Sequence, residues 1–164
     1  MVFILSWLIP LLGLLILLES KGPIFFKQLR TGKNKKSFFC IKFRSMRFNK
    51  DADLKQATQN DTRITNIGRF IRKTSLDEFP QFINVFKGEM GLGGPRPPML
   101  KHTFDYPKVA DDYMIRQFIK PGITGWAQIN GYRGEITNPE QIQMRVNKDL
   151  WYLENWTLWL DIQI

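Results

Sequence analysis

The first eighteen residues of the chain carry no charged side chain and are almost entirely apolar. A helix of this length reaches the lower limit for crossing the ~30 Å hydrocarbon core of a membrane, so we expect the segment to enter one. Pro10 lies at its centre, where proline removes a backbone donor and clashes with the preceding turn, which predicts a sharp kink. A kinked spanning helix and a re-entrant helix that enters and leaves by one leaflet both fit. We predict the re-entrant helix, over residues 1–20.

The formal net charge of +9 is concentrated directly after this segment. Residues 21–50 contain ten Lys and Arg and no acid, so the rest of the chain nets −1 (14 basic minus 15 acidic residues). A basic run beside an apolar segment favours anionic lipid headgroups, with about 1 kcal/mol per nearby Lys or Arg, and it places that end on the cytoplasmic side. RNA is the rival partner. The chain carries no recognisable RNA-binding signature, so we expect no nucleic acid.

The single cysteine and the single histidine limit the metal chemistry of the chain. Cys40 alone excludes an internal disulfide and a cysteine-based zinc site, and His102 alone excludes a pair of histidine ligands. We expect His102 to be structural and the surroundings to be reduced and cytoplasmic.

The pattern after residue 20 predicts one mixed α/β, helix-rich domain over residues 21–164. Residues 24–30 and 37–43 are rich in β-formers and flank a basic tip, which predicts a β-hairpin. Helical patterns cover residues 63–73, 79–86, 106–118 and a segment from 138 onwards, with a short surface helix or loop over 51–59.

The last helix carries the clearest local signals. Asn138 is a good N-cap and Pro139 suits the first helical position. Its apolar stripe consists of Ile142, Val146, Leu150 and Leu153. The tryptophans and tyrosine that follow are typical of a membrane interface, which predicts helices packed at the membrane surface.

Two adjacent carboxylates, Asp77 and Glu78, lie where a helix should begin. Ser75 and Glu78 match the Ser-x-x-Glu capping box, in which Glu78 would only satisfy a helix N-terminus. Pro80 argues against a helix capped at Ser75, because it would lie beyond the first turn. A helix that starts near Asp77 instead leaves both carboxylates at its positive end, where an aspartate stays ionised and nucleophilic.

Arg96 lies between two prolines, in a Gly-Pro-Arg-Pro loop. It is either a solvated turn residue or part of a phosphate clamp, in which a guanidinium and backbone amides bind the anion together.

Read in order, several segments resemble the bacterial sugar transferases, the monotopic phosphoglycosyl transferases. The resemblance rests on residues 22–28, 42–46, 72–81, 84–90, 94–97, 120–131 and 155–161, which cover nearly the whole chain. The stretch 130–135, together with His102, looks most like the undecaprenyl-phosphate glucose phosphotransferases.

The resemblance implies transfer of a sugar 1-phosphate, most of all glucose 1-phosphate, from a UDP-sugar to undecaprenyl phosphate. It implies release of UMP, a covalent phosphosugar-aspartate intermediate and Mg²⁺ as cofactor, in a first membrane step of exopolysaccharide synthesis. Asp77 would be the nucleophile and Glu78 its acid-base or metal-organising partner, and the two would hold the metal. Arg72 and Arg96 would bind phosphate, and Arg133 is a nucleotide-side candidate. The enzyme would lie on the cytoplasmic face of the bacterial inner membrane.

The chain departs from the family pattern at a few positions. The family's re-entrant helix turns at a Ser-Pro pair, and here Ile9 precedes Pro10; Gly93 replaces a usually aliphatic residue. We expect the chain to be a catalytic core that lacks segments at both ends. The alternative sugar is galactose or an N-acetylated sugar. The rival function is that of a non-catalytic basic module that binds lipid headgroups or RNA. The sequence does not decide whether the chain forms a homo-oligomer.

Overall fold

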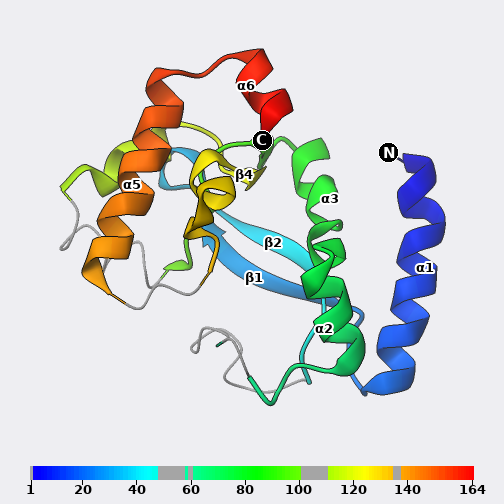
Figure 1. The fold of residues 1–164 in the computed structure, drawn as a ribbon. Coiled ribbons are helices and arrows are strands. Elements are labelled where there is room, and N and C mark those ends of the chain that lie inside the picture. The colour runs from blue at the N-terminus through cyan, green and yellow to red at the C-terminus, as the bar shows by residue number, and fades with distance from the viewer. Residues whose placement is uncertain (1, 48–57, 59–60, 101–110, 135–137) are drawn as a thin grey trace. The chain divides into compact units, whose positions relative to one another are not determined.

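The computed structural model describes residues 2–47, 58, 61–100, 111–134 and 138–164. Its elements, in chain order, are α1 (Val2–Glu19), β1 (Phe25–Thr31), η1 (Lys33–Lys35), β2 (Ser37–Phe43), α2 (Asn66–Lys73), η2 (Leu76–Glu78), α3 (Gln81–Phe86), β3 (Gly91–Gly93), η4 (Asp111–Phe118), β4 (Gly122–Thr124), η5 (Gln128–Tyr132), α5 (Pro139–Glu154) and α6 (Leu158–Gln163) (Figure 1). The mixed α/β, helix-rich class is confirmed, and the described residues form two two-stranded sheets. The expectations for residues 51–57, 59, 102, 106–110 and 135 fall outside the described residues.

Two compact units make up the chain: residues 1–28 with 40–83, and residues 29–39 with 84–164. The β1–β2 hairpin, which the sequence predicted, contributes residues to both. Whether residues 21–164 act as one functional unit stays a prediction.

The first unit has its core between α1, β2 and α2. Leu8, Leu12 and Ile16 recur every fourth residue of α1, which places them on one face. They pack in one buried cluster with Phe43 and Ile71. Apolar side chains on the other faces of α1 are exposed, namely those of Trp7, Leu11, Leu14, Leu17 and Leu18.

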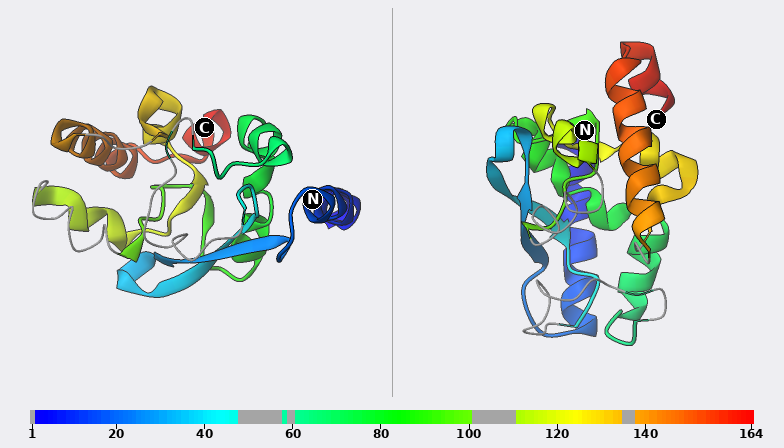
Figure 2. Two further views of the ribbon diagram at one scale, coloured as in Figure 1. Left: turned by 90° about the horizontal axis from the view of Figure 1, so that it is seen from below. Right: turned by 90° about the vertical axis from the view of Figure 1, so that its left-hand side faces the viewer.

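The expected sharp kink at Pro10 is not seen. α1 continues as one helix through Pro10. Figure 1 shows it side-on as one continuous run of turns, and the left-hand view of Figure 2 looks nearly along its axis. A proline inside a helix removes one backbone hydrogen bond, and the packing of Leu8 and Leu12 on either side holds the helix together. Among the helices of the described residues, none has both the length and the apolar character that a membrane crossing requires.

The C-terminus of α1 and the N-terminus of α2 are joined by polar side chains. Glu19 accepts hydrogen bonds from the backbone N–H groups of Asn66 (2.6 Å) and Ile67 (2.8 Å). The buried Arg44 donates to the carbonyls of Ser20 and Lys21. A negative charge therefore binds two of the unsatisfied N–H groups at the start of α2, and a positive charge binds the carbonyls that directly follow α1.

In the second unit, β3 and β4 pair in parallel, with Gly91 opposite Gly122 and Gly93 opposite Thr124. The backbones meet closely at Gly94 and Gly122, where an added Cβ on Gly122 would lie 2.3 Å from the Gly94 nitrogen. Glycine is required here because a side chain would separate the two strands. This contact fixes the start of the Gly-Pro-Arg-Pro loop.

Helix α5 confirms its sequence signals. The Asn138 side chain accepts the N–H of Gln141 at 2.9 Å. Ile142 and Val146 are buried against Tyr113 of η4, with Leu150 packed beside them. The described part of the expected 106–118 helix is a 3₁₀ helix, η4, instead of an α-helix.

Candidate active site

The Asp77–Glu78 pair lies on a short 3₁₀ turn, η2, between α2 and α3. Both residues are buried, with 9% and 6% of their surface exposed. The expectation that they occupy the first turn of the following helix is wrong, because α3 begins only at Gln81. Pro80 has no N–H with which to continue the turn, so the chain ends η2 at Glu78 and starts a new helix after the proline.

The capping box is not formed either. Ser75 adopts a left-handed conformation, with φ of 60°, and its side chain does not cap η2. This conformation costs a non-glycine residue roughly 1–2 kcal/mol, and such strain concentrates at functional sites. The Ser75 N–H donates to the carbonyl of Arg72, and the Glu78 N–H donates to the carbonyl of Ser75. Ser75 therefore ends α2 and turns the chain into the carboxylate pair.

Glu78 is held by Lys42, a residue that sequence reasoning did not single out. The Lys42 Nζ lies 2.7 Å from Glu78 Oε1, and the two side chains are 17% and 8% exposed. A buried charge is tolerated when it is paired, and removing one partner is strongly destabilising. The available signal was a lysine between two buried apolar residues of β2, Ile41 and Phe43, inside the 42–46 motif.

Arg72 lies in the last turn of α2, in the same unit as Asp77, and is half-buried. A cation at this end of a helix is favoured by the helix dipole. Arg96 and Arg133 lie in the second unit, so their convergence with Asp77 stays a prediction.

Arg96 belongs to a loop that is fixed by backbone hydrogen bonds on both sides. The carbonyl of Pro95 accepts the N–H of Gly122 (3.0 Å), and the carbonyl of Pro98 accepts the N–H of Thr31 (3.1 Å). Arg30 donates to the carbonyl of Pro97 at 3.0 Å. The arginine loop is thus more ordered than a solvated turn.

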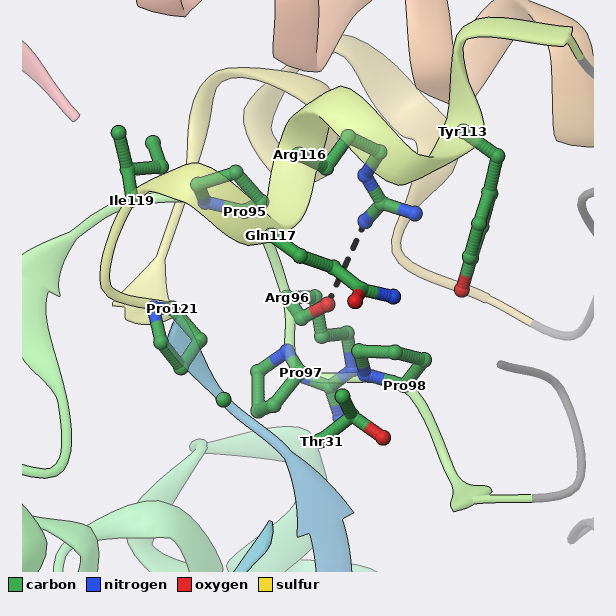
Figure 3. A pocket seen from close by; sticks show the side chains of 11 residues that line it. Thr31, Pro95, Arg96, Pro97, Pro98, Tyr113, Arg116, Gln117, Ile119 and Pro121 are labelled. Carbon is green, nitrogen blue, oxygen red and sulfur yellow. Dashed lines mark hydrogen bonds between the residues drawn. The ribbon is translucent and has the colours of Figure 1, made fainter. Parts of the chain in front are cut away.

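A small pocket opens beside this loop. It is lined by residues of β1, the arginine loop, η4 and the start of β4, which are Thr31, Gly32, Pro95, Arg96, Pro97, Pro98, Tyr113, Arg116, Gln117, Ile119 and Pro121 (Figure 3). Its volume is about 20 Å³, which is room for one water molecule. A larger ligand would therefore bind at its mouth.

Arg133 is exposed and directly follows η5. The backbone on both sides of it is held by Arg145 of α5, whose Nη2 donates to the carbonyls of Tyr132 and of Gly134, the latter at 3.1 Å. The Arg133 side chain is thereby presented to solvent on an anchored loop.

Asp77 and Glu78 have the donor chemistry that a magnesium site completed by substrate would use, and their metal-binding role stays a prediction. Within the described residues, no three His, Cys, Asp or Glu side chains gather where they could hold a metal ion. Mg²⁺ at phosphate-transfer sites commonly uses one or two carboxylates, with the remaining positions filled by substrate phosphates and water. Two adjacent buried carboxylates supply that donor set.

Comparison with known proteins points in the same direction. The family model described as "Bacterial sugar transferase" matches residues 1–164. A UDP-glucose:undecaprenyl-phosphate glucose-1-phosphate transferase of Xanthomonas campestris pv. campestris is 49% identical over 90% of this chain and 31% of its own length. The Escherichia coli K12 protein of the same name is 49% identical over 93% of this chain and 33% of its own length.

A relative with another sugar in its name matches as well. A UDP-N-acetylgalactosamine-undecaprenyl-phosphate N-acetylgalactosaminephosphotransferase of Aeromonas hydrophila is 40% identical over 93% of the chain and 36% of its own length. The chain thus spans about a third of the length of these curated relatives.

Proposed function

Since the chain belongs to the bacterial sugar transferase family, as its motif series predicted, we propose that it transfers glucose 1-phosphate from UDP-glucose to undecaprenyl phosphate and releases UMP. The observation that carries this proposal is the buried Asp77–Glu78 pair, presented by the strained turn after Ser75. Burying two adjacent carboxylates is costly, and this cost is explained when they perform chemistry. The names of the relatives support the choice of substrates.

In the first step, a carboxylate oxygen of Asp77 attacks the phosphorus that carries the sugar. The bond from that phosphorus to the bridging oxygen breaks, and UMP leaves with the bridging oxygen and its electron pair. The sugar phosphate is then attached to Asp77 as an acyl phosphate. A carboxylate is a suitable nucleophile because it splits one difficult displacement into two easier ones.

In the second step, a phosphate oxygen of undecaprenyl phosphate attacks the same phosphorus. The bond to Asp77 breaks, the carboxylate is regenerated, and the sugar is released on undecaprenyl diphosphate. Neither displacement needs a proton from the protein, so we assign Glu78 to organising the metal and not to proton transfer.

Asp77 and Glu78 would hold Mg²⁺, which supplies charge neutralisation at the transferring phosphate when bound. Lys42 keeps Glu78 in a fixed position through the 2.7 Å ion pair. Arg72 and Arg96 bind the phosphates and Arg133 the nucleotide side, since positive groups that are already in place stabilise the charge of the transition state.

The lipid acceptor requires an active site at the membrane surface. We propose that α1 is a re-entrant anchor, with both ends of the helix on the cytoplasmic face of the inner membrane. This placement requires α1 to bend at Pro10 when it enters lipid, because the helix described here is continuous through that residue. The exposed apolar side chains of α1 support insertion into lipid. A second apolar surface is exposed at the C-terminal end and consists of Trp156, Leu158, Trp159 and Ile162. Tryptophans there suit the headgroup level.

The decisive experiment uses Asp77→Asn, which preserves shape and removes the anionic oxygen. Wild type with Mg²⁺ and radiolabelled UDP-glucose, without lipid acceptor, should carry label on Asp77, and the variant should carry none and release no UMP. Asp112→Asn, an exposed aspartate of η4, is the matched control and should behave as wild type. Full turnover by Asp77→Asn, or label mapped to another residue, refutes the assignment and favours the non-catalytic basic module.

The sugar and the anchor need separate tests. A panel of UDP-glucose, UDP-galactose and N-acetylated UDP-sugars should give the fastest UMP release with UDP-glucose; turnover of another sugar alone would overturn that choice and leave the mechanism intact. Val2→Cys should resist a membrane-impermeant thiol reagent applied to the outside of intact cells. Modification from outside would mean that α1 crosses the membrane.

A further inference from the structure

Asp149 of α5 forms a buried ion pair that the proposed chemistry does not use. Its Oδ2 lies 2.7 Å from the Nε of Arg116, and the two side chains are 2% and 6% exposed. A buried ion pair often gives no more stability than well-packed apolar residues of similar volume. Stability alone is therefore a weak explanation for this one.

Arg116 connects Asp149 to the arginine loop. Its guanidinium lies 4.9 Å from the centre of the Tyr113 ring, and its Nη2 donates to the carbonyl of Arg96 at 3.4 Å. Figure 3 shows Arg116 extended from η4 with its guanidinium toward that carbonyl. The arginine loop is thus bound by two elements, because η4 binds the carbonyl of Arg96 and Arg30 of β1 binds the carbonyl of Pro97.

A second arginine links Asp149 to the other candidate loop. Arg145 precedes Asp149 by four residues on α5, so the two side chains lie on one face of the helix. Burial raises the pKa of the Asp149 carboxyl above its ordinary value, and the charges of Arg116 and Arg145 oppose that rise. Arg145 in turn binds the carbonyls of Tyr132 and Gly134, on either side of Arg133.

We propose that Asp149 is a positioning residue that holds the loops of Arg96 and Arg133 in one arrangement, through Arg116 and Arg145. The proposal rests on the proposed function, because it assigns those loops to the diphosphate and nucleotide of the UDP-sugar. Without the carboxylate, the buried guanidinium of Arg116 and the half-buried guanidinium of Arg145 would repel each other and withdraw from the loop carbonyls. Loops that are already fixed bind the UDP-sugar more tightly, because less conformational entropy is lost when the ligand binds.

The test compares Asp149→Asn, which keeps the shape and removes the charge, with Asp149→Glu, which restores the charge. Asp149→Asn should raise the KM for UDP-glucose and the Kd for UDP about tenfold. The kcat should change less than about threefold, because the variant weakens binding of the substrate and of the transition state equally. Asp149→Glu should recover part of the affinity. Asn147→Ala, an exposed position on the same helix, should match wild type.

A second variant keeps the test valid if Asp149→Asn folds poorly. Arg116→Met combined with Asp149→Leu removes both charges and fills the space with apolar atoms, which can leave stability unchanged. A wild-type melting temperature with a raised Kd for UDP supports positioning. A wild-type Kd in this double variant, or a lowered melting temperature with unchanged KM in Asp149→Asn, overturns it. If wild type itself neither binds UDP nor releases UMP, the proposed function fails and this inference with it.

Discussion

Substitution of Gly68 by alanine separates helix propensity from tertiary packing. In an exposed helix interior, alanine is more stable than glycine by about 1 kcal/mol. Gly68 lies in α2, where an added Cβ would be 1.9 Å from the carbonyl oxygen of Ser45 and 2.8 Å from the Thr65 Oγ1. The first of these distances is about 1 Å shorter than real Cβ contacts allow. We therefore expect Gly68→Ala to destabilise the protein.

The size of this destabilisation follows from the shift of α2 that the added Cβ would require. Shifting α2 by about 1 Å breaks the hydrogen bond from the Thr65 N–H to the Ser45 carbonyl, now 3.2 Å, at about 1 kcal/mol. It also disturbs the Thr65 cap on the Gly68 N–H, now 2.9 Å, at about 1 kcal/mol. Overpacking strain adds about 1–3 kcal/mol. After the helix-propensity gain of about 1 kcal/mol is subtracted, we expect a net loss of about 2–4 kcal/mol.

Thermal unfolding of the detergent-solubilised protein measures this loss. For a chain of this size, about 2–4 kcal/mol corresponds to a fall of roughly 4–16 °C in melting temperature. Gly13→Ala is the matched control, because its Cβ would meet only the flexible Ile24 side chain, at 3.0 Å, and its melting temperature should change by less than about 3 °C. Activity of Gly68→Ala should also fall, since η2 follows α2 directly. A melting temperature equal to or above wild type would refute the reasoning.

Three further predictions concern local conformation and charge. Ser75→Gly should retain turnover and stability. Ser75→Val should lose about 1–2 kcal/mol of stability and most UMP release, because a β-branched residue resists the left-handed conformation. Equal melting temperatures for the two variants would contradict this prediction. Gly93→Ala should lower the melting temperature because its Cβ would lie 2.4 Å from Asp161 Oδ1, and Gly134→Ala, with no neighbour within 4 Å of its Cβ, should not. Burial raises the pKa of the Glu19 carboxyl, but the backbone N–H groups of α2, the Thr65 side chain and the charge of Arg47 together lower it by more, so the pKa lies below its ordinary value of 4.5. The stability that Glu19 provides is therefore present above about pH 4.5 and lost as the pH falls through the folded-state pKa. In chemical denaturation, the free energies of unfolding of wild type and Glu19→Gln should converge as the pH is lowered. A difference that stays constant with pH would exclude this role.

Several features could be predicted from the sequence because they depend on near neighbours. The helix from Pro139 follows from its Asn138 cap and from an apolar stripe at helical spacing, both of which act within a few residues. The hairpin follows from two β-rich runs around a basic tip. The candidate nucleophile Asp77 and the arginines at 72, 96 and 133 were identified by local motifs, and their catalytic roles stay predictions.

Only the tertiary structure decided the partners of the charged side chains. Lys42 and Glu78 are 36 residues apart, and Arg116 reaches Asp149 across two helices, so no local rule pairs them. Tertiary packing also decided that α1 continues through Pro10 and that Ser75 adopts a left-handed conformation. Packing against residues distant in the sequence supplies enough free energy to override a local preference of about 1–3 kcal/mol, and that free energy exists only once the chain has folded.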